Sequence, residues 1–367
     1  MPAKKIPVTP KFVERQQNVL NLLPQEYDGL WITNMSNIRY LTNFSGSSGG
    51  LLLSRNEIIF FTDFRYQEQS SQEVRKNALI SIYKISSAEA FVEYLKAKKL
   101  KKIAIEGCLT IEILEILKKN SEGKVEFQMV KNLPEKIRRN KDKPEMEFLQ
   151  KAFNIADKAF QKLLKFIRSG RKELEIAAKL EFFLSSLGSE KTSFDTIVAS
   201  GERASCPHAK PTEKKVAAGE MLKIDFGAVY KGYHSDMTRT VFLGTPDEKF
   251  NKIYNTVLEA QRLAVKTLKP GVSCFDVDKV AREHIKSAGF GDYFGHGLGH
   301  SLGLDIHESP NLSTKCNEIV ESGNVFTVEP GIYIPGWGGV RIEDVYVVET
   351  SDLKRLTNTT NELIVIK

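Results

Sequence analysis

The second half of this 367-residue chain repeats itself at an interval of about 100 residues, and this duplication constrains the fold more than any other feature. Three pairs of segments correspond in the same order: SGRKELEIAAKLEFFLSSLG (169–188) with PGVSCFDVDKVAREHIKSAG (270–289), HAKP (208–211) with HESP (307–310), and AGEMLKIDFG (218–227) with SGNVFTVEPG (322–331). One chance match would be unremarkable, but three in the same order indicate a structural repeat. We therefore expect residues 145–367 to form one domain of two related helix–helix–hairpin halves about a pseudo-twofold axis.

The first part of the chain has a different pattern, which changes near residue 140. Strand-like runs such as GLWIT (29–33), GLLLS (50–54) and EIIFFT (57–62) alternate with amphipathic stretches such as PKFVERQQNVLNLL (10–23). This alternation is typical of an α/β domain. The predicted organisation is therefore an α/β domain over 1–140 and an α+β domain over 141–367.

A charged segment, KIRRNKDKPEME (136–147), separates the two predicted domains. We interpret it as a charged hinge, with Pro144 near the first turn of a new helix. The net charge of +7 raises the possibility of nucleic-acid binding. The basic clusters KAKKLKK (96–102) and KIRRNKDK (136–143) lack interleaved aromatic residues, however, and suggest solvated faces or a linker.

The pattern of the first residues and the spacing of the cysteines both favour a cytoplasmic protein. The start, MPAKKIPVTPKF, has no apolar region after its basic residues, so we do not expect a secretory signal. No apolar run approaches the roughly 20 residues needed to cross a bilayer. The 4 cysteines form no CxxC pair, which suits a reducing compartment and argues against a thiolate zinc site.

Both predicted hairpins carry pairs of acidic residues. If MLKIDFGAVYKGYHSDMTRTVFL (221–243) turns at positions 230 and 231, Asp225 and Asp236 face each other across the ladder. Gly232 would also allow a longer loop, and with it a different register. In the second copy, Glu329 and Glu343 are centred on position 336. Opposed carboxylates repel each other unless a cation lies between them. Four inward carboxylates therefore predict a cation site rich in oxygen ligands.

Half of the 6 histidines lie in FGHGLGHSLGLDIHE (294–308), as His296, His300 and His307. The glycines of this stretch disfavour a helix and let the backbone wrap closely around a site. The alternatives are ordinary surface or core histidines, and the HExxH signature is absent because position 297 is Gly. Beside four carboxylates, one neutral imidazole would favour Mn, Co, Fe or Zn.

Several motifs resemble those of the pita-bread metallopeptidases, a group that includes methionine aminopeptidase, aminopeptidase P and prolidase. They are SFDTIVASGERASCPHAKPT (193–212), IDFGAVYKGYHSDMTRT (224–240), GHGLGHSLGLDIHESP (295–310), TVEPGIYIP (327–335) and GGVRIEDVYVV (338–348). NIRYLTNFSGSSG (37–49) and FTDFRYQEQ (61–69) resemble the creatinase-like domain of the proline-specific members, most closely the aminopeptidase P relatives. The resemblance covers essentially the whole chain. Creatinase itself shares the architecture but not the metal ligands.

The resemblance implies a centre of two divalent metal ions, for which we expect Mn²⁺, with Co²⁺ or Zn²⁺ as alternatives. Its five ligands would be Asp225, Asp236, His300, Glu329 and Glu343. Asp236 and Glu343 would bridge the ions, Asp225 would bind one ion, and His300 and Glu329 the other. A hydroxide between the metals would attack the peptide carbonyl, with Glu329 as the proton shuttle.

Other residues would act around this centre. His208 and His307 occupy equivalent places in the two halves, and we expect them on opposite sides of one cleft, as donors to the oxyanion. The resemblance places His296 in the proline-side pocket. Arg341 shares a strand face with Glu343 and would bind either that or another carboxylate, or the substrate directly.

The predicted activity is that of an aminopeptidase P-like exopeptidase, which cleaves the bond before a proline at the second position of a peptide. The alternative is prolidase activity, restricted to Xaa-Pro dipeptides. A methionine or general aminopeptidase is disfavoured by the N-terminal domain, and a non-catalytic peptide-binding module by the full ligand set. The resemblance also suggests a homodimer in which Arg65 and Tyr66 reach the partner's cleft.

Overall fold

The computed structural model describes residues 11–74, 76–83 and 87–367, and it divides the chain into two compact units, Met1–Arg138 and Arg139–Lys367. The first ten residues of MPAKKIPVTPKF (1–12), for which we expect no secretory signal, lie outside the described residues. Within the described ranges, no helix is both long and apolar enough to cross a membrane.

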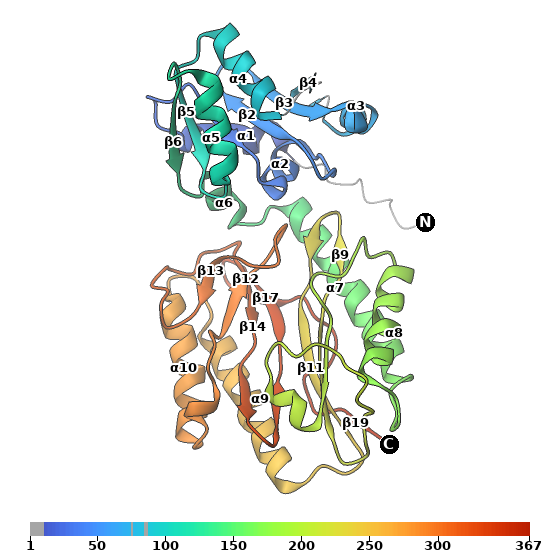
Figure 1. The fold of residues 1–367 in the computed structure, drawn as a ribbon. Helices are drawn as coiled ribbons and strands as arrows, with labels where there is room; N and C mark the ends of the chain where they lie inside the picture. The colour runs from blue at the N-terminus through green and yellow to red at the C-terminus, as the bar shows by residue number, and fades with distance from the viewer. Residues whose placement is uncertain (1–10, 75, 84–86) are drawn as a thin grey trace, which may run out of the picture. The chain divides into compact units, whose positions relative to one another are not determined.

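The described residues of the N-terminal unit form the expected α/β arrangement (Figure 1). The strands are β1 (Gly29–Ile32), β2 (Gly50–Ser54), β3 (Ile58–Asp63), β4 (Leu79–Tyr83), β5 (Lys102–Glu106) and β6 (Glu126–Val130). They form one mixed sheet in the order β4-β3-β2-β1-β5-β6. The helices are α1 (Phe12–Leu22), α2 (Met35–Thr42), α3 (Gln67–Glu73), α4 (Ser87–Lys98), α5 (Ile111–Ser121) and α6 (Leu133–Arg138), with a 3-10 turn η1 (Phe64–Tyr66). The three strand predictions and the first helix are confirmed.

The basic segment KIRRNKDK (136–143) contains the boundary between the two units, as a linker would, but two of its basic side chains are buried rather than solvated. Its first residues belong to α6, and the side chain of Arg138 is buried, where it donates to Asn37 Oδ1 at 2.7 Å. Lys141 is also buried and pairs with Glu308 at 2.9 Å. These basic side chains have polar partners inside the protein, so burial does not leave their charge unsatisfied.

The C-terminal unit contains the predicted duplication. The first half comprises α7 (Lys143–Leu164), α8 (Glu173–Ser186), β7 (Ile197–Ser200), the 3-10 turn η2 (Gly201–Ser205), β8 (Met221–Phe226), β9 (Val229–Tyr230), β10 (Tyr233–His234) and β11 (Met237–Leu243). The second half comprises α9 (Glu248–Thr267), α10 (Cys274–Ser287), η3 (Gly291–Tyr293), β12 (Gly299–Ser301), β13 (Glu308–Leu312), β14 (Val325–Val328), β15 (Gly331–Ile334), β16 (Gly338–Arg341) and β17 (Asp344–Val348). The chain ends with β18 (Leu353–Arg355) and β19 (Val365–Ile366).

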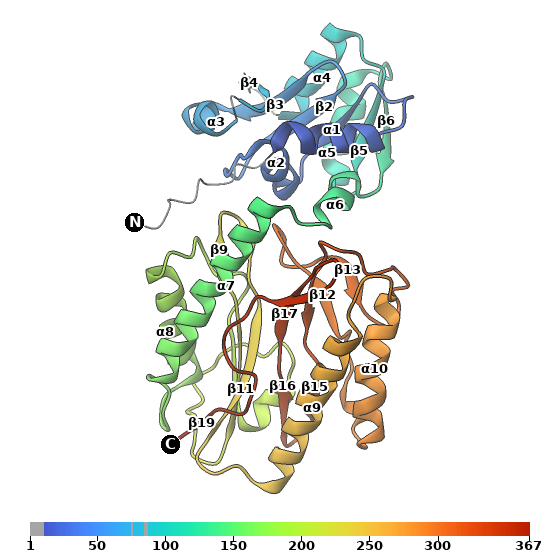
Figure 2. The same cartoon turned by 180° about the vertical axis from the view of Figure 1, so that it is seen from behind.

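The two halves repeat each other's hydrogen bonds as well as their elements. In the first half, Gly170 donates its N–H to Val216 O at 2.8 Å, and in the second half Gly271 donates to Val320 O at 2.9 Å. Each bond ties the start of a helix, α8 or α10, to the segment that leads into a hairpin. Figures 1 and 2 show α7 and α8 on one side of the strands and α9 and α10 on the other.

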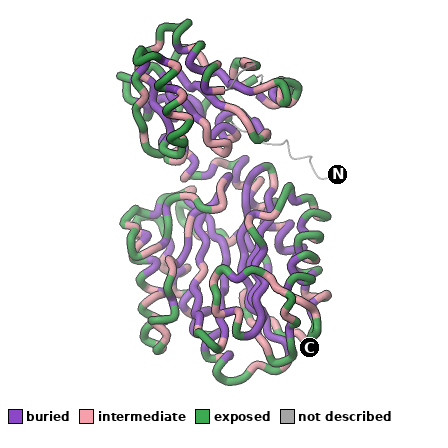
Figure 3. The backbone as a smooth tube through the Cα atoms, in the orientation of Figure 1, coloured by how far each residue is buried: buried purple, intermediate pink, exposed green. Residues whose placement is uncertain are grey.

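Each half has its own apolar core, so both hairpins are held from behind by a helix pair. One cluster joins α7 and α8 to β8 and β11, and a second joins α9 and α10 to β14, β16 and β17. Figure 3 shows the strands of this unit as almost continuously buried, whereas the helices alternate between buried and exposed positions. The burial of one helix face is the expected pattern for amphipathic helices against a sheet.

The register of the first hairpin differs from the prediction. Asp225 lies opposite Thr238, and Asp236 falls in the short step between β10 and β11. The turn is formed by Lys231 and Gly232, one position later than predicted, with φ angles of 52° and 81°. Two successive positive φ angles are characteristic of a tight hairpin turn that follows the twist of the strands. This turn shifts the pairing by two residues, so Asp225 and Asp236 are diagonal neighbours on one face.

The second hairpin has the predicted register. Gly331 pairs with Arg341, a pairing that is centred on Gly336. Glu329 and Glu343 lie in the steps between β14 and β15 and between β16 and β17, and the same register continues beyond them. Three of the four acidic residues therefore occur where the regular ladders open, whereas Asp225 is the penultimate residue of β8.

Candidate metal centre

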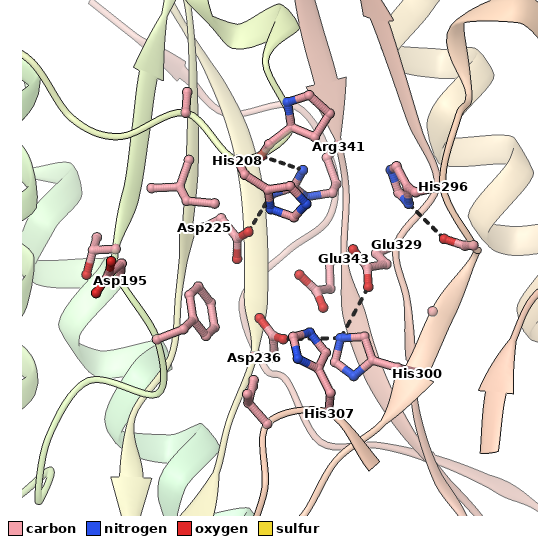
Figure 4. A pocket seen from close by; sticks show the side chains of 18 of the residues that line it. Asp195, His208, Asp225, Asp236, His296, His300, His307, Glu329, Arg341 and Glu343 are labelled. Carbon is pink, nitrogen blue, oxygen red and sulfur yellow. Dashed lines mark hydrogen bonds and ion pairs between the residues drawn. The ribbon is translucent and has the colours of Figure 1, made fainter. Parts of the chain in front are cut away.

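A cavity of about 640 Å³ in the C-terminal unit is lined by residues from both halves. The predicted site residues of this unit all line it: His208, Asp225, Asp236, His296, His300, His307, Glu329, Arg341 and Glu343. In Figure 4 the carboxylates of Asp236, Glu329 and Glu343 lie at the centre, with Arg341 and His208 on one side and His300 and His307 on the other. The pseudo-twofold arrangement thus brings two distant hairpins to one site.

The stretch around His300 is a short strand rather than a helix, and the close approach of backbones explains its glycines. A Cβ on Gly299 would lie 2.0 Å from the carbonyl oxygen of Thr327. Only glycine fits at this crossing of β12 and β14. The backbone N–H of His300 donates to Thr327 Oγ1 at 2.9 Å, and this bond fixes the position of the backbone from which the imidazole extends.

The hydrogen bonds of His300 identify the nitrogen that faces the acids. Nδ1 lies 3.0 Å from Ser301 O, and because a carbonyl can only accept, Nδ1 carries the proton. Burial lowers the pKa of His300, so the ring is neutral at pH 7. Its Nε2 therefore presents a lone pair 3.4 Å from Glu329 and 3.6 Å from Asp236. A lone pair directed at carboxylates suits a cation between them.

The carboxylates of this site are buried and close to one another. Burial, and after it the charge of Glu343, raises the pKa of Asp236 well above its ordinary value. Burial and then the charge of Glu329 do the same to the pKa of Glu343. Oxygens of Asp225 and Glu343 are buried without a hydrogen-bond partner in the described part of the chain. Ligand atoms of Asp236, His300 and Glu343 lie within 4.8 Å of one another. Unpartnered oxygens, a nitrogen lone pair and mutual repulsion fit a centre for divalent metal.

Two threonine side chains position these acids. Thr327 Oγ1 donates to Glu329 Oε1 at 3.1 Å. Thr238 donates to Glu343 Oε2 at 2.8 Å and accepts from Arg341 Nε at 3.0 Å. Polar partners of this kind orient ligands around metals.

Arg341 is almost completely buried and makes its ion pair with Asp225 rather than with Glu343. Its Nη1 donates to Tyr333 Oη at 2.8 Å and to Pro207 O at 3.2 Å. The guanidinium is therefore used within the protein. This arrangement favours its action through Asp225 over direct contact with substrate.

His296 lines the cavity as a neutral ring with both nitrogens engaged. Nδ1 is 2.7 Å from Gly297 O and must carry the proton. Nε2 then accepts from the hydroxyl of Tyr333 at 2.9 Å, and this hydroxyl in turn accepts from Arg341. Burial lowers the pKa of His296, in agreement with a neutral imidazole. Tyr333 was missed in the sequence because a tyrosine inside a strand is usually a packing residue.

His208 and His307 are exposed and reach the cavity from the two loops that the HxxP repeat relates. The ring of His307 packs edge-on against that of His300, with 4.5 Å between centroids. His234 is buried, and its backbone N–H donates to Gly303 O at 2.8 Å.

Arg65 belongs to the other unit. It lies in η1, where its Nε and Nη2 donate to both carboxylate oxygens of Asp63 at 2.8 Å. Its side chain is 61% exposed, which leaves the guanidinium accessible to solvent.

Comparison with known proteins agrees with this geometry. Metallopeptidase family M24 matches residues 147–350, and the Creatinase/Prolidase N-terminal domain matches residues 16–139. An Xaa-Pro dipeptidase from Pyrococcus furiosus is 38% identical over 96% of this chain and 99% of its own length. The solved Xaa-Pro dipeptidase from Bacillus anthracis has a TM-score of 0.91 and 39% identity, covering 97% of this chain and 99% of that one. An X-Pro aminopeptidase from Thermotoga maritima has a TM-score of 0.88 and 34% identity, covering 96% and 100%.

The duplicated C-terminal unit, with a creatinase-like unit before it, has the pita-bread architecture of a metal-dependent hydrolase. The chain belongs to metallopeptidase family M24.

Proposed function

We propose that this protein is a dinuclear metal-dependent exopeptidase that hydrolyses the bond between an N-terminal residue and proline. The observation that carries the proposal is the meeting of two carboxylate-bearing hairpins, His300, His208 and His307 in one cavity. The relatives named as Xaa-Pro peptidases, which match nearly the whole chain, support the substrate class.

The metal ligands would be Asp225, Asp236, His300, Glu329 and Glu343. We propose Mn²⁺, with Co²⁺ or Zn²⁺ as alternatives, because four carboxylates and one imidazole suit hard to borderline cations. A pair of such ions, when bound, supplies Lewis acidity and a nucleophilic water at neutral pH.

The proton of the reaction would be held by Glu329. Thr327 donates to its Oε1, which leaves Oε2 to take up the proton and later pass it to the leaving nitrogen. His208 and His307 would donate hydrogen bonds to the oxygen of the former carbonyl, since both are exposed in the cavity.

Preference for proline is consistent with the state of His296. A peptide bond to proline has no N–H to offer, and the ring is apolar. Because both nitrogens of His296 are engaged, this residue presents a neutral ring to the cavity and no spare donor. Such a wall accepts a pyrrolidine ring without leaving a polar group unpaired.

Two substrate ranges remain candidates. The sequence motifs favour cleavage at the N-terminus of longer peptides, whereas the Xaa-Pro dipeptidase relatives favour dipeptides. Purified protein should be stripped of metal, reconstituted with Mn²⁺, and offered Ala-Pro, Ala-Pro-Ala and Ala-Ala-Ala. We expect hydrolysis of one or both proline peptides and not of Ala-Ala-Ala. Cleavage of Ala-Pro alone would assign a dipeptidase.

Metal dependence provides a separate test of the proposal. Chelation should abolish hydrolysis, and Mn²⁺ or Co²⁺ should restore it, because every proposed ligand is an oxygen or imidazole donor arranged for divalent ions. Metal content should be followed by elemental analysis. Full activity in an exhaustively demetallated sample would rule out the mechanism.

A further inference from the structure

Lys223 is a fully buried lysine inside β8, two residues before Asp225 and therefore on the same face of the strand. It forms no ion pair with a carboxylate in the described part of the chain. Its Nζ instead donates to three main-chain carbonyl oxygens: Ala204 at 3.0 Å, Cys206 at 2.6 Å and Pro207 at 3.4 Å. The same Nζ lies 5.0 Å from the ring centroid of Tyr333.

These three carbonyls belong to the segment that leads into His208. After η2, residues 206–212 form no regular secondary structure, and position 207 is a proline, which has no N–H to donate. The Pro207 carbonyl also accepts from Arg341 Nη1. The segment is thus held by side chains rather than by a strand ladder.

A close backbone contact supports the segment from another side. A Cβ on Gly339 of β16 would lie 2.4 Å from the carbonyl oxygen of Ala204, so β16 crosses directly against it. Glycine at position 339 permits this approach of the two backbones, and Lys223 binds the carbonyl oxygens of Ala204, Cys206 and Pro207. Burial of a lysine is costly unless its donors are satisfied, and here the acceptors come from one short segment.

We propose that Lys223 is a positioning residue that fixes the backbone before His208 relative to the metal ligand Asp225. Because Lys223 and Asp225 share one strand, the imidazole of His208 is placed at a set distance from the carboxylates. The inference rests on the proposed role of His208 as a donor in catalysis. It adds a residue that contacts neither substrate nor metal.

A double-mutant cycle tests this proposal with the metal-loaded, full-length protein and the best of the proline peptides above. Lys223→Met keeps most of the volume of the side chain and removes its donors. We expect its kcat to fall toward that of His208→Ala, by about 10²-fold, with KM and bound metal unchanged. In the His208→Ala background, Lys223→Met should cause no further loss. An unchanged kcat in Lys223→Met, or losses that multiply in the double variant, would overturn the proposal.

Ile224→Val is the matched control. Ile224 lies on the same strand but belongs to the core behind it, so this variant should lower the melting temperature without changing kcat. If Lys223→Met does not yield folded protein, Lys223→Leu, which also lacks a donor, supplies the same cycle, with the same two outcomes. Wild-type inactivity toward every proline peptide would count against the proposed function and not against Lys223.

A second readout is independent of turnover. Cys206 is exposed within the held segment, so its alkylation by iodoacetamide, mapped by mass spectrometry, reports how firmly the segment is fixed. We expect faster alkylation of Cys206 in Lys223→Met than in wild type or Ile224→Val. Equal rates in all three proteins would contradict the positioning role.

Discussion

Thr238 is the small side chain through which two parts of the candidate centre are connected. Its hydroxyl donates to Glu343 and accepts from Arg341, which in turn pairs with Asp225. One threonine thus orients proposed ligands from both hairpins. A hydroxyl in this position serves as donor and acceptor at once, which no apolar side chain of the same size can do.

Thr238→Val should weaken metal binding and activity by roughly 10- to 100-fold, because it leaves Arg341 Nε and Glu343 Oε2 without their partner in a buried site. Thr238→Ser keeps the hydroxyl and should stay close to wild type. Titration with Mn²⁺ and kcat/KM measure the two effects. Wild-type Mn²⁺ affinity in the valine variant would show that the hydroxyl is not needed.

Ligands and donors should respond differently to truncation. Asp236→Ala or Glu343→Ala should lose both bound metal and activity, since each removes a carboxylate that we propose to bridge the ions. His208→Ala should keep its metal and lose about 10²-fold in turnover, the scale of one transition-state donor. Metal content and kcat separate the cases. If His208→Ala lost metal as completely as His300→Ala, the proposed role of His208 as a donor and not a metal ligand would be wrong.

At the scale of elements, α9 contributes a side chain at the point where the second hairpin opens. Gln261 is buried, and its Nε2 donates to Val328 O at 3.1 Å and to Ile342 O at 3.2 Å. These carbonyls immediately precede Glu329 and Glu343 along the chain. The helix therefore completes hydrogen bonding where the strands step apart to present their acids.

Gln261→Leu should lower the free energy of unfolding by about 1–3 kcal/mol, the usual cost of leaving buried carbonyls unpaired. It should also reduce Mn²⁺ affinity, because both glutamates lose a fixed neighbour. Arg262→Ala, on the exposed side of the same helix, is the control. Denaturant unfolding and metal titration give the two quantities. A destabilised variant with unchanged Mn²⁺ affinity would limit Gln261 to a role in folding.

At the scale of the whole molecule, the family resemblance suggests a homodimer in which Arg65 reaches the partner's cleft. Arg65 is exposed and paired only locally with Asp63 in the described residues, so its removal should not unfold the N-terminal unit. Arg65→Ala should raise KM for Xaa-Pro-Yaa peptides, less so for the shortest substrates, and leave metal content unchanged. Lys118→Ala, on the exposed face of α5, is the control. A fully active monomer in sedimentation would exclude this arrangement.

The amino-acid sequence alone determined the elements and the kinds of residue at the site. Periodicity and glycine placement act over a few residues, so three strands and the first helix of the N-terminal unit, and the duplication of the C-terminal unit, could be recognised without coordinates. The family resemblance added the ligand set as an expectation, and the structure brings those residues to one cavity. The register of the second hairpin followed from its symmetric acids, Glu329 and Glu343.

Only the tertiary structure decided which groups touch. The first register was wrong by two residues because the turn at Lys231 and Gly232 was not identified. The contacts of Arg341 with Asp225, and of Lys223 with the segment before His208, depend on how separate elements pack. Spacing along the chain carries little information about such contacts, because they join residues that local preferences do not connect. A shift in strand pairing exchanges the partners of every side chain, so position in the fold determines which charges meet.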